Sequence, residues 1–369
     1  MKSLSRKMFW WFAHSARKAR CGRLFYSCMK PFAGRGGAEE AKPLETFWPD
    51  RGESCICINE ISPEPNYDLQ IIVPAYNVAD YVGECLDSIL SQQTHFSFKV
   101  VVVNDGSTDG TAEVLRQYED RDCVLIITQA NRGLSGARNT ALLDVDARYV
   151  TFVDSDDMLC PGAVEAWMEK AVRLDADIVE GGFERFDSRG VISSSPHIDS
   201  DDDRSLSGFA WGKVYKADLF GRVHFPEGYW FEDSVCCAIL HPCADLIATV
   251  PGIQYRWRRN EQSITSLSKV SPRCIESYWV MKKMVEDRRR LGLVMTDEVA
   301  YYFLWQVTVN YRRVARLYDV EIDRSLFAET CSLFADNFSP EDFERFDSPV
   351  AEAVFNRDYV SYVLACAFL

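Results

Sequence analysis

Residues 69–153 alternate short β-branched runs with segments of helical periodicity, and this alternation constrains the fold more than any other feature of the sequence. The apolar runs predict strands at 69–74, 99–103, 124–127 and 149–153. The segments between them predict helices at 78–90, 108–118 and 135–143. Strands that alternate with helices of about ten residues predict a mostly parallel sheet with helices on both faces. The expected fold class is α/β.

Polar residues directly follow three of the predicted strands, at 74–77, 104–110 and 154–157. Any one of these segments is also what a turn, a helix cap or a solvated acidic loop looks like. Ligands of parallel sheets bind beyond the carboxyl ends of the strands, however. Three polar segments at one edge of one sheet therefore predict a binding site.

The residue types at this edge suit a nucleotide and a divalent metal. Asp154 and Asp156 are two residues apart and share a side in extended backbone, so they offer hard oxygen ligands to Mg²⁺ or Mn²⁺ bound with a phosphate. Asp105 can accept hydrogen bonds from a base or ribose, and Arg132 and Arg138 can donate to phosphate or sugar oxygens. The sequence has no GxxxxGK[ST] loop and no GxGxxG after a strand, which disfavours ATPases and dinucleotide-dependent dehydrogenases.

Four blocks resemble the family-two glycosyltransferases of GT-A fold, of the bacterial polysaccharide-assembly type. They are IVPAYN at 72–77, VNDGSTD at 103–109, NRGLSGARN at 131–139 and VDSDD at 153–157. The resemblance implies a metal-binding DxD motif with Asp154 and Asp156 as ligands. It further implies a nucleotide-sugar site, for which the expected residues are Pro74, Ala75, Tyr76, Asn77, Asp105, Arg132, Gly133, Arg138, Asp154 and Ser155.

The resemblance continues more thinly through WGKVYK at 211–216, FPEG at 225–228 and FED at 231–233. It implies that Asp233 is the general base, which takes the proton of the acceptor hydroxyl, and that Glu232 orients loops or acceptor. The alternative is that both acids merely open a helix, where they favour its dipole. Residues 255–264 are expected to form either a closing loop whose arginines approach the diphosphate or a solvated charged loop.

The ends of the chain differ from this central part. Residues 1–38 contain nine Lys and Arg and no acid. Since the whole chain has a formal charge of −14, the remaining residues have a formal charge of −23. The apolar run 8–13 is too short for a membrane span and a poor fit to a signal peptide. The segment is interpreted either as an interfacial element on an anionic inner leaflet or as a disordered leader. The expected organisation is a basic extension and linker at 1–65, a GT-A domain at 66–265 and a helical region at 266–369.

The whole pattern, with the resemblance, implies an inverting, metal-dependent transfer of a sugar from a nucleotide-sugar, UDP-linked, to a glycan or lipid-linked glycan acceptor. The implied setting is capsular, exopolysaccharide or lipopolysaccharide biosynthesis. Thirteen cysteines without a CxxC indicate reduced thiols and a cytoplasmic protein. Peripheral contact with the membrane is the expectation that follows from the basic segment 1–38 as an interfacial element. The acidic chain is not expected to bind nucleic acid. One alternative is a catalytically silent nucleotide-sugar-binding module. Another, nucleotidyl transfer, lacks the Gly-rich basic loop that it needs.

Overall fold

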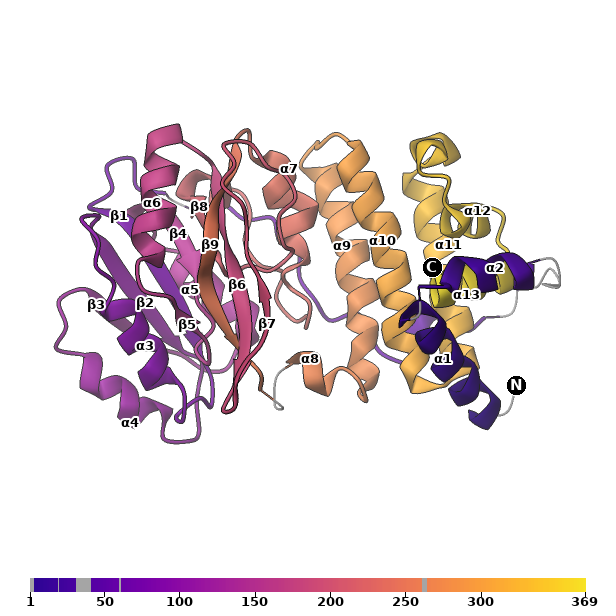
Figure 1. The fold of residues 1–369 in the computed structure, drawn as a ribbon, viewed down its shortest axis with the longest axis horizontal. Coiled ribbons are helices and arrows are strands. Elements are labelled where there is room, and N and C mark those ends of the chain that lie inside the picture. The colour runs from indigo at the N-terminus through magenta and orange to yellow at the C-terminus, as the bar shows by residue number, and fades with distance from the viewer. Residues whose placement is uncertain (1–2, 19, 31–40, 60, 261–263) are drawn as a thin grey trace. The chain divides into compact units, whose positions relative to one another are not determined.

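The computed structural model describes residues 3–18, 20–30, 41–59, 61–260 and 264–369. These residues divide into two compact units (Figure 1). The sheet unit comprises Glu53–Gly228 and Glu232–Glu261, and the helical unit comprises Met1–Gly52, Tyr229–Phe231 and Gln262–Leu369. The sequence-based division at 65 and 265 does not anticipate that the N-terminal residues group with the C-terminal helices, because that grouping rests on contacts between segments far apart in the chain.

One half of the sheet is the parallel α/β arrangement that the sequence predicts. Its neighbouring strands are all parallel, and in spatial order they are β3 (Val124–Thr128), β2 (Phe98–Asn104), β1 (Tyr67–Ala75) and β4 (Ala147–Phe152). Three helices connect them: α3 (Val82–Leu90), α4 (Thr111–Leu115) and α5 (Gly133–Leu142). The predicted strands and helices of 69–153 are therefore confirmed, with boundaries that differ by a few residues.

The other half of the sheet is mixed, which the sequence pattern does not indicate. The strands continue from β4 in the order β8 (Lys213–Lys216), β6 (Ile178–Asp187), β9 (Ile247–Arg258) and β5 (Met158–Leu159). β8 is antiparallel to both neighbours, β5 is antiparallel to β9, and β7 (Gly190–Ser195) pairs antiparallel with β6. Residues 255–258 are part of β9, so the expectation that 255–264 forms a loop is wrong for these four residues.

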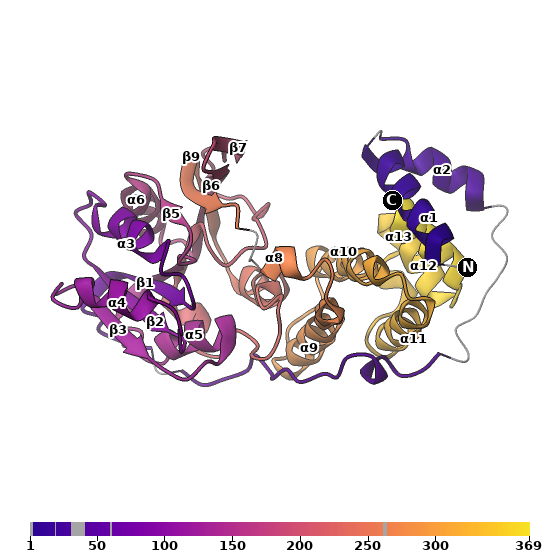
Figure 2. The same ribbon diagram turned by 90° about the horizontal axis from the view of Figure 1, so that it is seen from below.

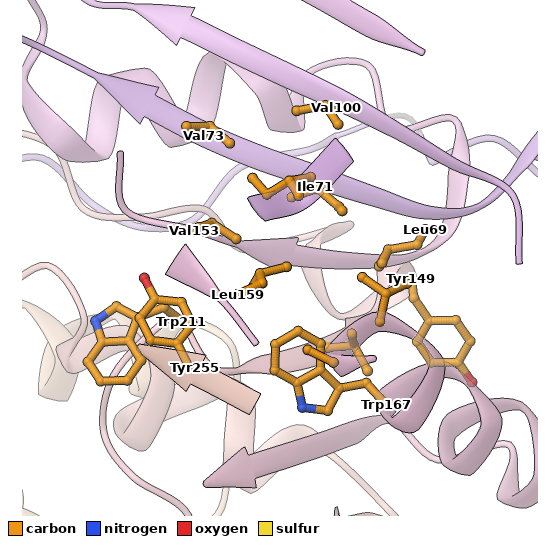
Figure 3. Close-up of a cluster of buried hydrophobic side chains, with 14 of the residues drawn as sticks. Leu69, Ile71, Val73, Val100, Tyr149, Val153, Leu159, Trp167, Trp211 and Tyr255 are labelled. Atoms are coloured by element: carbon orange, nitrogen blue, oxygen red, sulfur yellow. The ribbon is translucent and has the colours of Figure 1, made fainter. Parts of the chain in front are cut away.

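The core of the sheet unit fixes the strand ends where the polar segments begin. Leu69, Ile71 and Val73 alternate along β1 and pack with Val100 of β2 (Figure 3). Helix α6 (Ala163–Leu174) contributes the fully buried Trp167. Because β1 is buried along most of its length, its last residues have little freedom to move.

The helical unit contains the C-terminal helices that the sequence predicts for 266–369. In order they are α8 (Ile264–Leu267), α9 (Glu276–Arg290), α10 (Asp297–Val314), α11 (Val320–Asn337), α12 (Pro349–Phe355) and α13 (Tyr359–Phe368). Side chains of Thr296 and Asp319 cap α10 and α11. Two N-terminal helices, α1 (Ser3–Lys18) and α2 (Gly22–Met29), lie beside α13 (Figure 2). No helix among the described residues is both long and apolar enough to cross a membrane.

Candidate functional site

The first two polar segments are joined by hydrogen bonds at the ends of β1 and β2. Pro74 and Ala75 are buried in β1, whereas Tyr76 and Asn77 are exposed beyond it. Asn77 has a left-handed φ of 52°, a conformation that Asn tolerates better than most residues. Its side-chain oxygen accepts a hydrogen bond of 2.8 Å from the backbone N–H of Thr108. The structure thus brings the predicted nucleoside-binding segments together.

Asp105 is buried and organises the next loop. Its carboxylate accepts hydrogen bonds from the backbone N–H of Arg132 and from the side chain of Gln129, both at 2.8 Å. The neighbouring Gly106 has a φ of 71°, and a Cβ there would stand 2.9 Å from the backbone nitrogen of Asn131. Only glycine suits so close an approach in this conformation. Asp105 therefore fixes the loop that leads into α5, and its predicted contact with a nucleoside stays a prediction.

The start of α5 is bound to the FPEG segment at 225–228. Arg132 precedes the helix and pairs with Glu227 at 2.7 Å, and Gly133 begins it with a φ of 77°. Asn139 lies on the same helix, and its side-chain amide donates to the backbone carbonyl of Phe225 at 2.8 Å and to the Glu227 carboxylate at 3.1 Å. Sequence reasoning assigned no role to Glu227 or Asn139, because nothing in their local sequence pairs them across 88 residues.

Arg138 joins two predicted parts of the site. Its guanidinium is 2% exposed and donates to Asp154 Oδ1 through Nη2 and to Glu232 Oε1 through Nη1, each at 2.8 Å. The Phe225 ring lies 4.9 Å away, at cation–π distance. The Arg138 donors therefore face protein carboxylates, which is a use that the sequence analysis does not foresee.

The acidic loop after β4 carries three carboxylates with different surroundings. Asp154 is partly exposed, Ser155 is buried, and the Asp156 side chain accepts a hydrogen bond of 3.0 Å from Asn260. Burial, reinforced by the charge of Asp154, raises the pKa of Asp156. Asp157 is buried, and its pKa is raised well above its usual range by burial and by the two neighbouring carboxylates.

Asp157 ties the acidic loop to β9, which sequence reasoning missed. Its carboxylate accepts hydrogen bonds from the Tyr255 hydroxyl at 2.8 Å and from the Arg258 backbone N–H at 2.7 Å. The Arg258 side chain donates to the backbone carbonyl of Asp156 at 2.7 Å and pairs with Glu84 at 2.6 Å. Arg258 therefore supports the backbone of the acidic loop, and its predicted approach to a diphosphate stays a prediction.

The residues at this edge fit a divalent cation held jointly by protein and substrate. Among the described residues, no group of three or more His, Cys, Asp or Glu is arranged to hold a metal ion. Asp154 and Asp156 supply carboxylate oxygens, and burial together with the charge of Asp154 raises the pKa of Asp156, an unfavourable arrangement of charge that a cation would relieve. Mg²⁺ is commonly bound through one or two carboxylates together with substrate phosphates and water.

Glu232 and Asp233 differ in accessibility. Glu232 is buried, and burial raises its pKa to about 7, with the charge of Asp233 acting in the same direction and Arg138 opposing both. Asp233 is only partly buried. The helical segment begins at Ser234, so the alternative that these acids open a helix is consistent with the backbone. That alternative does not account for the ion pair between Glu232 and Arg138.

A family comparison bears directly on this arrangement. Residues 70–214 match the model of the family described as "Glycosyl transferase family 2". The chain carries a family-two glycosyltransferase domain. The domain contains the Asp105 loop, α5 with Arg138, and the acidic loop with Asp154 and Asp156, whereas Glu232 and Asp233 lie beyond the matched segment.

Curated relatives share this domain over part of their length. Glycosyltransferase GlyA of Streptococcus pneumoniae is 39% identical over 188 residues, which is 45% of this chain and 27% of GlyA. Glycosyltransferase EpsJ of Bacillus subtilis is 30% identical over 218 residues, 54% of this chain and 63% of EpsJ. The poly(ribitol-phosphate) beta-glucosyltransferase of Bacillus spizizenii is 31% identical over 169 residues, 43% of this chain and 27% of that protein. The match thus spans about a quarter to two thirds of each relative.

A solved structure shares the fold. Residues 1–349 of S. aureus TarS, determined in complex with UDP-GlcNAc, superpose with a TM-score of 0.63 over 80% of this chain and 89% of that one, at 20% identity. The predicted GT-A fold, with its sheet flanked by helices and a C-terminal helical region, is confirmed.

Proposed function

We propose that the chain is an inverting, metal-dependent glycosyltransferase. In this proposal it moves one sugar from a nucleotide-sugar, UDP-linked, to a glycan or lipid-linked glycan acceptor during cell-surface polysaccharide assembly. The observation that carries the proposal is the two ion pairs made by the buried Arg138 guanidinium, one to Asp154 of the predicted metal site and one to Glu232, the neighbour of the predicted general base. The bound UDP-GlcNAc of TarS and the names of the relatives support this substrate class.

The residues proposed to bind the nucleotide-sugar donor lie within the segment 70–214 that matches the family-two model. The joined loops at the ends of β1 and β2, which include Asn77 and Asp105, would receive the nucleoside. Asp154 and Asp156 would hold the divalent metal, Mn²⁺ or Mg²⁺, which neutralises the negative charge of the departing diphosphate. Arg138 keeps the Asp154 carboxylate in place through its 2.8 Å ion pair.

Asp233 is the proposed general base. An inverting transfer needs a carboxylate on the face of the sugar opposite the leaving nucleotide, where it accepts the proton of the attacking acceptor hydroxyl. Glu232 is buried and already bound to Arg138, so it is poorly placed to meet an acceptor. Asp233 is adjacent and partly exposed, which suits it to that contact. Glu232 is then a positioning residue.

The proposal places the reaction in the cytoplasm. Buried cysteines such as Cys236 and Cys366 pack as small hydrophobic side chains, which is typical of thiols in a reducing compartment. A lipid-linked acceptor resides in a membrane, so the proposal includes peripheral contact with the cytoplasmic face of that membrane. The silent binding module remains the competing function, and it differs from the enzyme in one measurable respect, since it binds the donor without transferring the sugar.

Thermal unfolding of the full chain with UDP-, GDP- and dTDP-sugars, with and without Mn²⁺, tests the donor half. A ligand that binds only the folded state at about 100 times its Kd stabilises it by about 2.7 kcal/mol. We expect an increase in Tm that requires both Mn²⁺ and a UDP-sugar. A chain that is folded but gains no stability from any nucleotide-sugar would contradict the proposal.

Asp156→Ala should remove the metal-dependent part of that increase, because one of the two proposed ligands is lost. The measurement is donor affinity by calorimetry with and without Mn²⁺. Asp120→Ala, which removes an exposed carboxylate from another loop, is the matched control and should retain full metal dependence. An Asp156→Ala chain whose donor affinity still rises with Mn²⁺ as in the unaltered chain would rule out this ligand assignment.

A further inference from the structure

Helices α1 and α2 carry a charge that sets them apart from the rest of the chain. Residues 1–38 contain nine Lys and Arg and no Asp or Glu, whereas the remaining residues have a formal charge of −23. Such a segment in an otherwise acidic protein is attracted to anionic surfaces from which the rest of the chain is repelled. Neither the family-two domain nor the proposed transfer reaction uses these helices.

The inner face of the two helices is fixed within the helical unit. Ala13, Ala16 and Tyr26 are buried, and the ring of Phe368 on α13 lies 5.6 Å from Phe9. Gly22 packs so closely on α13 that a Cβ there would stand 2.1 Å from the backbone carbonyl oxygen at position 368. This close packing holds α1 and α2 on α13, so their opposite face has a defined direction.

The outer face combines exposed apolar and basic side chains. Met8 on α1 is 67% exposed, whereas the ring of Phe12, one helical turn further on, packs against Phe25 at 4.7 Å and Phe368 at 6.1 Å. Leu24 on α2 is 65% exposed. Lys18 and Arg23 are exposed near the junction of the two helices. We call the four exposed residues Met8, Lys18, Arg23 and Leu24 the basic helical face.

We infer that the basic helical face binds the headgroup layer of an anionic lipid bilayer. Helices that present large apolar side chains among Lys and Arg lie in this layer, with the apolar groups at the acyl boundary and the cations at the lipid phosphates. The Lys and Arg residues are spread through the sequence of the segment and do not form one compact cluster. Such a distribution suits a fluid anionic surface, whose charges have no fixed positions. This contact would keep the chain where a lipid-linked acceptor resides.

Two exposed aromatic side chains on α10, in the same unit, show why the neighbouring charge decides which apolar surface is expected to bind lipid. Tyr301 and Trp305 on α10 are 57% and 51% exposed and also lie one turn apart. The first turn of that helix carries Asp297 and Glu298, however. An anionic surface would repel these carboxylates, so the α10 pair lacks the charge complementarity of the basic helical face and provides a control for exposed apolar residues.

Vesicle sedimentation of the full chain tests the inference. The vesicles are phosphatidylcholine alone or phosphatidylcholine with about a third of anionic phosphatidylglycerol. We expect binding to the anionic vesicles only, and weaker binding as salt is added. Each basic side chain near such a surface contributes about fivefold to partitioning, so the double variant Lys18→Gln with Arg23→Gln should bind about 25-fold more weakly. Its matched control is Arg121→Gln with Arg148→Gln, two exposed arginines of the sheet unit.

Substitutions of the apolar groups complete the test. Met8→Ser with Leu24→Ser should also weaken binding to anionic vesicles, whereas Trp305→Ser should bind as the unaltered chain does. All the substituted side chains are largely exposed, so the variants should keep the Tm of the unaltered chain. Equal binding to neutral vesicles, or equal weakening by the Arg121 and Arg148 control, would overturn the inference. Absence of binding to anionic vesicles would also overturn it, and would leave an acidic protein as the partner to seek.

This test is independent of sugar transfer, because vesicle binding requires neither donor, metal nor acceptor. Asp233→Asn should bind anionic vesicles as the unaltered chain does. A chain that binds vesicles through the basic helical face but transfers no sugar would uphold the lipid contact and contradict the proposed function. A chain that transfers sugar to a water-soluble acceptor but ignores anionic vesicles would do the reverse.

Discussion

Asp233→Asn should retain donor binding and lose sugar transfer by about 100-fold or more, the scale expected when a positioned general base is removed. Asparagine keeps the size and polarity of the side chain but cannot accept the proton of the acceptor hydroxyl. The expected signature is therefore a fall in kcat with donor affinity close to that of the unaltered chain. Single-turnover transfer and donor calorimetry measure the two quantities separately.

Two further variants show whether this loss is specific to Asp233. Asp202→Asn neutralises an exposed carboxylate of the same unit and should leave transfer unchanged. Glu232→Gln disturbs the partner of Arg138 instead of the proposed base, so it should lower stability as well as transfer. Transfer within a few-fold of normal in Asp233→Asn would move the general base to another residue.

The parallel half of the sheet follows from local sequence, whereas the mixed half does not. Strands such as β2 are continuous β-branched runs, buried over their last five residues, and are recognisable on their own. β6 contains Gly181 and Gly182 and charged residues, and β8 is four residues long. Their strand conformation depends on pairing with β9 and β4, which lie far away in the sequence. Hydrophobic periodicity therefore cannot identify them.

The candidate site shows the same division between local and long-range information. Asp105, Asp154 and Asp156 are predictable because the carboxyl ends of parallel strands meet at one edge. The pairing of Arg138 with Glu232 spans 94 residues, and that of Tyr255 with Asp157 spans 98. Both depend on the mixed half of the sheet. Sequence motifs thus indicate which residues gather at the edge, and only the tertiary structure shows which of them neutralise one another.

Arg138→Met should lower the free energy of unfolding of the sheet unit by about 3–5 kcal/mol, because it leaves Glu232 buried without its cation. Asp154 is less affected, since its side chain is 27% exposed and can be hydrated. The chain has two compact units, so global unfolding is a poor measure. Hydrogen exchange of backbone amides in α5 and β4 reports the sheet unit directly.

Arg132→Met, at the residue that precedes the same helix, is the matched control. Its guanidinium is 48% exposed and pairs with Glu227, and an ion pair of that kind contributes about 0–1 kcal/mol. Adding Glu232→Met to Arg138→Met should recover part of the lost stability, because the buried carboxylate is then absent. If Arg138→Met costs no more than Arg132→Met, the buried network does not hold the site together.

The loss caused by Arg138→Met should also depend on pH, in a direction that the Glu232 carboxyl determines. Burial already raises the pKa of Glu232 to about 7 while Arg138 opposes the increase, so removing Arg138 raises the pKa further. An acid whose folded pKa exceeds its unfolded value destabilises the folded state increasingly as the pH rises above the unfolded pKa. Arg138→Met should therefore be closer to the unaltered chain at about pH 5 than at about pH 8. The double variant with Glu232→Met lacks the titrating carboxyl and should show a smaller change between the two pH values.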